Sequence, residues 1–575
     1  MKKILIAGAI VAAGALGYWL SQDKENNDQF LQNTALNYIP QETPLFSAQL
    51  TPFPIKTYVN SLSDADKKAT AELFEGLPIT DDPRGQFFNV LFNEYVTSLT
   101  SGEQFIQTWG LAEAVHGYFY TWGAIPVLKV DIANEKAFWH QLDKAESQSG
   151  MTHTQGQLQQ VQYRIYALGD EATKLDMLVA VNHHRLIVTF NTALNDEDLL
   201  TSALEISPIS DALSDSVMLD KIIDKYHFSD SSVSFINHEA LIKGITTLDG
   251  NRLATQLARY AKIEGEDGFA EFKQVQCSQE LQGIAANWPR TVMGLKGYSV
   301  TEESSMFDLT TVIETNNTVI LNALGAMRGF IPHYVQHLDG AVAALGLGLD
   351  TSQIASSLAD IWDDLLTPEY QCESLKQFQL QLSQSDPAML GMMTSMAKGV
   401  MGASVSLLDY QLTESDGGAV LKSADFIASI SSDEPVLLLN MAKMFLPNFA
   451  KVTLPSDGSV VDITDSLGLP SEWPIALKLA IKGKHLVIYS GKKGQAAAEQ
   501  LGLEKLVKND LAMVAFDSSR MLAPLQAYAK ITGAHDVVDL SNIEPQNMEV
   551  KIALNVDEGG IIIDSFVKSY KNNEQ

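Results

Sequence analysis

The chain has 575 residues, of which 46% are hydrophobic and 19% are charged, and its formal net charge is −30. This length exceeds what one hydrophobic core usually supports, so we expect more than one domain, and the composition is that of a folded globular protein. Because so negative a protein repels phosphate backbones, we expect no nucleic-acid partner and interpret the acidity as an aid to solubility.

The N-terminal segment predicts export from a bacterial cytoplasm. Lys2 and Lys3 precede an uncharged apolar run over residues 4–20, and a polar, mostly acidic segment follows it. Positive charge before the run orients the N-terminus toward the cytoplasm. We therefore expect the rest of the chain to lie in the periplasm, with residues 21–34 as a polar stalk.

The same run predicts a single-pass anchor in the inner membrane over residues 1–20. Its length reaches the lower limit for a spanning helix, and Tyr18 and Trp19 suit the membrane interface at its outer end. Cleavage after Ala15, as in a signal peptide, is the alternative that the sequence leaves open.

The chain also repeats itself. Two stretches read as β-hairpins, each with short apolar strands joined by four polar residues. They cover residues 179–188 and 479–488. In each half a helical stretch and another strand follow, at 198–204 and 232–236 in the first half and at 495–501 and 512–516 in the second. The shared order predicts a repeated architecture.

A shorter unit recurs in which an apolar strand ends at Asp, Asn or Thr and a helix follows. The instances are residues 45–51, 127–131, 233–237, 345–350, 436–440 and 514–517. Side-chain oxygens of these residues accept backbone N–H groups at helix N-termini. We therefore interpret the carboxylates at these positions as caps.

Three further hairpins are predicted at residues 298–314, 404–426 and 549–566, the last two around Gly417-Gly418 and Gly559-Gly560. Paired glycines supply the positive φ that tight hairpin turns need. The prediction is an α+β protein of two internally repeated lobes, 35–320 and 328–570. Each lobe is an antiparallel sheet with helices packed on one face, and the N-terminal anchor helix precedes them.

Residues 36–45, Leu-Asn-Tyr-Ile-Pro-Gln-Glu-Thr-Pro-Leu, resemble the Leu-Pro-Ala-Asp-Thr opening of the uncharacterised exported bacterial proteins of domain-of-unknown-function family 3352. Gln41-Glu42 stands where that group has Ala-Asp. Residues 138–142 and the hairpin at 179–188 are also similar to the group. The resemblance implies an exported protein of helices and strands, and it supplies no site residues.

Cys277 and Cys372 are the two cysteines of the chain. In an oxidising periplasm such a pair predicts a disulfide. Both residues precede a helix-like stretch and then a Pro, a Gly and a strand, which suggests comparable positions facing each other across the lobe junction. Two separated thiols are the alternative.

We predict no catalytic, cofactor-binding or metal-ligating residues. Full nucleophile-elbow, P-loop and dinucleotide patterns are absent from the sequence. His333 and His337 lack the further ligands that zinc needs. Asp360, Asp363 and Asp364 read as a solvated face of a helix over 352–366. The lysine-rich segments 482–485 and 491–494 read as solvated turns.

The expected function is therefore non-enzymatic: a periplasm-facing binding or scaffolding role in the cell envelope. The methionine-rich stretch 389–401 reads as a helix packed on the sheet, or as part of an apolar groove for lipid or peptide. The expected partners are the inner membrane, through the N-terminal helix, and an envelope protein or lipid. The alternative is an envelope hydrolase whose active-site residues are dispersed along the chain.

Overall fold

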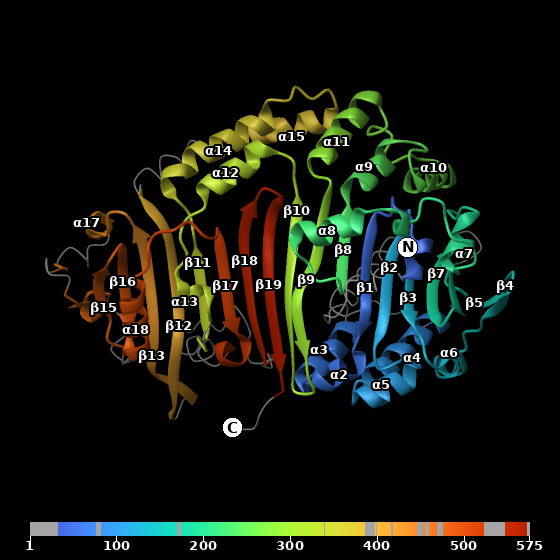
Figure 1. The fold of residues 1–575 in the computed structure, drawn as a ribbon, viewed down its shortest axis with the longest axis horizontal. Coiled ribbons are helices and arrows are strands. Elements are labelled where there is room, and N and C mark those ends of the chain that lie inside the picture. Colours follow the sequence, from blue (N-terminus) through green and yellow to red (C-terminus); the bar gives the residue numbers. More distant parts are fainter. Residues whose placement is uncertain are drawn as a thin grey trace. The chain divides into compact units, whose positions relative to one another are not determined.

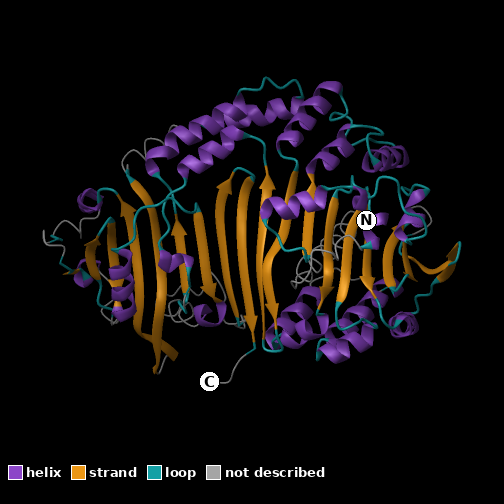
Figure 2. Ribbon diagram, in the orientation of Figure 1, coloured by secondary structure: helices purple, strands orange, loops and turns teal. Residues whose placement is uncertain are grey.

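A computed structural model describes residues 33–571 except 76–81, 170–173, 339, 386–396, 398, 416–417, 446–451, 455–458, 468–474 and 523–546. The chain forms two compact units (Figure 1). Unit 1 comprises residues 1–316, 370–374 and 569–575, and unit 2 comprises residues 317–369 and 375–568. Each unit combines helices with antiparallel strands, so the protein is α+β (Figure 2).

Ten strands of the described residues belong to unit 1. They are β1 (Leu45–Phe53), β2 (Val115–Trp122), β3 (Ile125–Asp131), β4 (Thr154–Leu158), β5 (Val161–Ala167), β6 (Asp176–Asn182), β7 (Arg185–Asn191), β8 (Ser232–Asn237), β9 (Arg290–Val300) and β10 (Ser304–Glu314). Their antiparallel pairings give the spatial order β4-β5-β6-β7-β3-β2-β1-β8-β9-β10.

The helices of unit 1 occupy the connections between these strands, apart from η2, which precedes β1. They are α2 (Ile55–Ser61), α3 (Asp64–Glu75), α4 (Pro83–Ser98), α5 (Gly102–Trp109), α6 (Glu135–Ser149), α7 (Asp198–Ala203), α8 (Met218–Tyr226), α9 (His238–Thr246), α10 (Arg252–Glu264) and α11 (Val275–Asn287), with the short 3-10 helices η2 (Thr34–Tyr38) and η3 (Leu213–Asp215).

Helices cover both faces of the sheet in unit 1, so the prediction of helices on one face is wrong. On one face, Phe87 of α4 and Phe138 of α6 pack against Val179 of β6. On the other face, Lys129 of β3 lies under Tyr38 of η2. The burial of β2 agrees with this arrangement. Its residues 117–122 are all buried, as expected for a strand whose two faces are both covered.

The strands of unit 2 are β11 (Ala343–Leu347), β12 (Val400–Ser415), β13 (Gly418–Ser432), β14 (Val461–Asp462), β15 (Lys478–Lys482), β16 (His485–Ser490), β17 (Ala512–Asp517), β18 (Met548–Asp557) and β19 (Gly560–Tyr570). Pairings among the first eight give the order β14-β15-β16-β13-β12-β11-β17-β18. The helices are α12 (Thr318–Met327), α13 (His333–Gln336), α14 (Thr351–Leu366), α15 (Glu373–Ser383), α17 (Pro435–Phe445) and α18 (Gly491–Leu501), with the 3-10 helix η5 (Thr464–Leu467).

Seven strands of each unit follow the same order. In unit 1 it reads β6-β7-β3-β2-β1-β8-β9, and in unit 2 it reads β15-β16-β13-β12-β11-β17-β18. The hairpins that the sequence predicts at 179–188 and 479–488 are β6/β7 and β15/β16, and each pairs with the third strand of its unit. In the first of them His183 and His184 form the turn with φ of 50° and 60°.

Several cap predictions are confirmed and others are wrong. Asn237 accepts the backbone N–H of Ala240 at the start of α9, and Asp350 accepts that of Ser352 at the start of α14. Residues 436–440, however, lie inside helix α17 and form no strand. Asp131 caps no helix: it accepts the backbone N–H of His116, and Asn134 caps α6 instead.

The predicted anchor at residues 1–20 and the stalk up to residue 32 lie outside the described residues, as do Met389 to Met396. Within the part that the structure describes, no helix has the length and apolarity needed to cross a bilayer.

Candidate functional site

An apolar groove lies on one face of the sheet in unit 2, with a volume of about 310 Å³. Its lining residues come from β11, β12, β13 and β16 and are Leu345, Leu347, Ala403, Ser404, Val405, Ala428, Ser429, Ile430, Leu486 and Ile488. The strand register brings these apolar side chains side by side across the sheet. Leu345 of β11 lies opposite Val405 of β12. Ala428 of the central strand β13 then lies opposite both Val405 and Ile488.

Several large apolar side chains of the groove are open to solvent, whereas Leu486 is buried. Leu345, Leu347 and Val405 are 47%, 45% and 45% exposed. Apolar surface in contact with water is unfavourable by roughly 25 cal/mol per Å². A contiguous exposed patch of this kind is typical of a binding surface.

Helices α13 and α18 lie on the opposite face of the same strands. On the groove face, α17 packs against Leu486 and Ile488 of β16. Successive side chains alternate between faces, which turns Ser404 and Ser429 away from the groove. Their hydroxyls hydrogen-bond the Tyr334 hydroxyl of α13 at 2.7 and 3.0 Å. Burial raises the pKa of Tyr334 to about 12, so its hydroxyl stays protonated at neutral pH.

His485 lies buried at the start of β16, next to Leu486 of the groove lining. Its Nδ1 lies 2.8 Å from the Ser431 hydroxyl, and its Nε2 has no hydrogen-bond partner among the described residues. Burial lowers the pKa of His485 below the ordinary value of 6.5. The folded protein therefore holds this imidazole neutral.

The protein should lose stability on acidification partly through His485. As pH falls through 6.5 the unfolded chain takes up a proton on this imidazole before the folded chain does, so the contribution is present above that pH and is lost as pH falls toward the lowered pKa of the folded state. Urea unfolding at pH 7 and pH 5 should show a smaller loss for His485→Gln than for the wild type, by at most about 1.4 kcal/mol per pH unit. Equal losses in the two proteins would contradict the prediction.

A second cluster, in unit 1, is charged and buried. Lys129 of β3 and Glu205 after α7 are both fully buried and lie 3.1 Å apart, Nζ to Oε1. Arg185 of β7 donates to both oxygens of Glu205, with distances of 2.6–3.0 Å. The Lys129 ammonium also lies over the rings of Tyr38 and Tyr120, 5.1 and 5.5 Å from their centroids.

Electrostatics keep this cluster ionised at neutral pH. Burial lowers the pKa of Lys129 to about 8, against the opposing effect of Glu205. Burial would raise the pKa of Glu205, but the charges of Lys129 and Arg185 outweigh it and the pKa is lowered. This cluster was not predicted, although a lone lysine between Leu128 and Val130 in an apolar strand was a signal for it.

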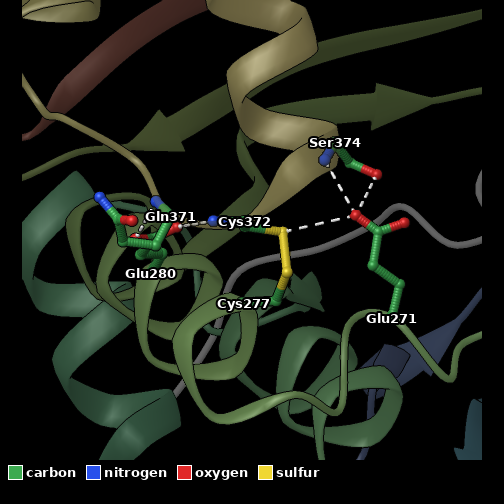
Figure 3. Close-up of a disulfide and its surroundings, with 6 residues drawn as sticks. All are labelled: Glu271, Cys277, Glu280, Gln371, Cys372 and Ser374. Atoms are coloured by element: carbon green, nitrogen blue, oxygen red, sulfur yellow. Dashed lines mark hydrogen bonds between the residues drawn. A yellow bond between two sulfur atoms is a disulfide. The ribbon is translucent and has the colours of Figure 1, made fainter.

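Cys277 and Cys372 are joined by a disulfide with Cα atoms 4.5 Å apart (Figure 3). Cys277 lies in the first turn of α11, and Cys372 directly precedes α15. Both residues belong to unit 1, because residues 370–374 return to it from the second half of the chain. Unlike the contiguous lobes of the prediction, the units are therefore interleaved in sequence.

Two glutamates hold the same segment. The Glu280 carboxylate accepts the backbone N–H groups of Gln371 and Cys372 at 2.6 and 2.9 Å. The Glu271 carboxylate accepts the backbone N–H and the hydroxyl of Ser374 at 2.9 and 2.8 Å (Figure 3). The cysteines do not occupy comparable positions: α11 leads into β9, the ninth strand of unit 1, whereas α15 precedes β12, the second of unit 2.

The other sequence candidates are scattered. The rings of His333 and His337 lie tilted against each other at α13, with centroids 4.3 Å apart. Asp364, near the end of α14, accepts a hydrogen bond from Asn317 at 2.7 Å. The predicted turn at 491–494 is instead the first turn of α18, where the ammonium of Lys493 pairs with Asp409 at 2.5 Å.

No protein-family model, no curated protein and no solved structure matches the chain. The resemblance to domain-of-unknown-function family 3352 therefore stays a prediction.

Proposed function

We propose that the protein is a non-enzymatic binding protein of the bacterial cell envelope, whose groove in unit 2 holds a single acyl chain. The observation that carries the proposal is the lining, which is aliphatic except for two serines whose hydroxyls are engaged on the opposite face. No titratable side chain is among the lining residues. A hydrolytic site would need a nucleophile, a base and oxyanion donors at one place. The two serine hydroxyls hydrogen-bond Tyr334 on the opposite face, and the lining residues include no side chain that could act as their base.

The strand pairing favours a hydrocarbon chain over an extended peptide. Each of β11, β12, β13 and β16 pairs with a neighbour on both sides. Their backbone groups are therefore engaged within the sheet and are not offered to a ligand on its face. A peptide backbone laid there would lose water without gaining partners, which is costly, whereas an acyl chain has no polar groups to satisfy.

The volume also suits one chain. About 310 Å³ is at the lower end of the range for small-ligand sites. Each buried methylene contributes about 0.8 kcal/mol, so about ten methylenes against Leu345, Val405 and Ile430 contribute about 8 kcal/mol, from which the cost of association is subtracted.

The sequence supports the rest of the proposal. Residues 1–20 are proposed to anchor the chain in the inner membrane, with residues 21–34 as a stalk, so that the groove faces the periplasm close to a source of lipid. The common strand order of the two units supports the further proposal that lobes 35–320 and 328–570 are copies of one module.

Photo-crosslinking tests the function. A diazirine-bearing palmitate added to membranes containing the full chain should give adducts on β11, β12, β13 and β16. Val405→Lys places an ammonium against the chain and should reduce these adducts about tenfold, equivalent to about 1.4 kcal/mol.

The matched control is Val507→Lys, the same change at a valine that is 63% exposed and outside the groove. It should leave the adducts unchanged. Adducts confined to other segments, or adducts on the groove strands that Val405→Lys leaves at the wild-type level, would refute the proposal.

A further inference from the structure

The outer edge of β4 in unit 1 has no strand beside it in the part of the chain that the structure describes. Among the described residues β4 pairs with β5 alone and is the end strand of its sheet (Figure 1). A two-residue loop joins Leu158 to Val161, which closes the hairpin. Because alternate residues of an antiparallel strand turn both backbone groups toward the partner, Gln155 and Gln157 turn theirs outward.

This edge lacks the usual protection against strand addition. Natural sheet edges carry lysines, prolines or bulges that prevent another strand from pairing. Residues 154–163 contain no charged residue and no proline, and the β4–β5 register runs without a bulge. Thr154, Gln155 and Gln157 are exposed. The edge is therefore a ready template for another strand.

We propose that a second copy of this chain adds its own β4 antiparallel to this edge, with Gly156 at the centre of the register. Gln155 of each copy then lies opposite Gln157 of the other, and the outward backbone groups of both residues are paired. In one copy the Gln155 amide hydrogen-bonds His153 and the Gln157 amide donates to the Gln159 carbonyl. Because glutamine amides both donate and accept, the two side chains can exchange these partners for each other across the contact. Gly156 lies where two antiparallel strands approach most closely, and it has no side chain to obstruct them.

The net charge of the chain favours a second copy at this uncharged edge, and the small contact area sets the strength of the association. Two copies that each carry a net charge of −30 repel, so an uncharged segment is where they can meet. The strand has five residues, and the contact is far smaller than a standard protein interface. The association is therefore weak and reversible.

Register-specific crosslinking tests the inference. Full-length chains carrying Gln155→Cys and differently tagged chains carrying Gln157→Cys are mixed and oxidised with copper phenanthroline. Residues in a hydrogen-bonded antiparallel pair have Cα atoms about 5.5 Å apart, within the range of a disulfide. We expect a linked heterodimer, and a several-fold lower yield when both chains carry Gln155→Cys. No heterodimer, or equal yields from the two mixtures, overturns the inference.

A second substitution in the Gln155→Cys chain separates backbone pairing from chance collision. Gln157→Pro removes an outward N–H while leaving the β4–β5 hydrogen bonds intact, because proline is tolerated on the solvent side of an edge strand. It should lower the heterodimer yield several-fold. Gln157→Ala keeps the N–H and should retain most of the yield. Equal yields with Pro and Ala would also overturn the inference.

Discussion

Replacing Glu205 by Gln should destabilise unit 1 by about 3–5 kcal/mol, because it leaves the Lys129 ammonium buried without its anion. Lys129 and Glu205 are both inaccessible to solvent, so water cannot compensate for the lost charge. Arg185 keeps a partner in Thr34, whose hydroxyl it contacts at 3.2 Å. Urea unfolding at pH 7 measures the loss.

A double-mutant cycle isolates the ion pair. Lys129→Met in the Glu205→Gln background removes the unpaired charge and should recover most of the lost stability, since replacing both members of a buried pair is often close to neutral. A loss below about 1 kcal/mol for Glu205→Gln alone, or no recovery in the double variant, would show that the pair does not stabilise the fold in this way.

Local patterns predicted the hairpins correctly because their information lies within a few residues. The polar turn at His183-His184 and the paired glycines at Gly559-Gly560 each specify a turn between apolar strands. The strand prediction for residues 436–439 was wrong because a short apolar run fits a strand and a helix equally well. Pro435 at the first helical position was the signal for α17.

The groove could not be predicted, because it depends on register between distant strands. Leu345, Val405, Ala428 and Ile488 come together only when four strands pair in one alignment. The sequence pattern of a single strand does not indicate which of its two faces the helices will cover. The Lys129–Glu205 contact likewise joins residues 76 positions apart. Composition and periodicity predict elements, whereas these sites arise from tertiary pairing.

The Cys277–Cys372 disulfide should contribute about 4–5 kcal/mol, which Cys277→Ser with Cys372→Ser would remove. The bond spans 95 residues, and in the chain-entropy model a loop of about this length restricts the unfolded chain by that amount. Because Glu280 and Glu271 hold the segment 371–374 by hydrogen bonds, the folded arrangement should survive without the bond. The loss should therefore appear as a lower urea midpoint of a still folded protein.

Reduced wild-type protein is the matched control and should have the same urea midpoint as the double-serine variant. Thiol labelling of denatured, unreduced protein should modify no cysteine, and the mass should be that of a monomer, since a bond between chains would also hide both thiols. Two modified thiols per chain would refute the bond. A midpoint unchanged by reduction would instead refute its contribution, because the unfolded chain would then gain no freedom when the loop opens.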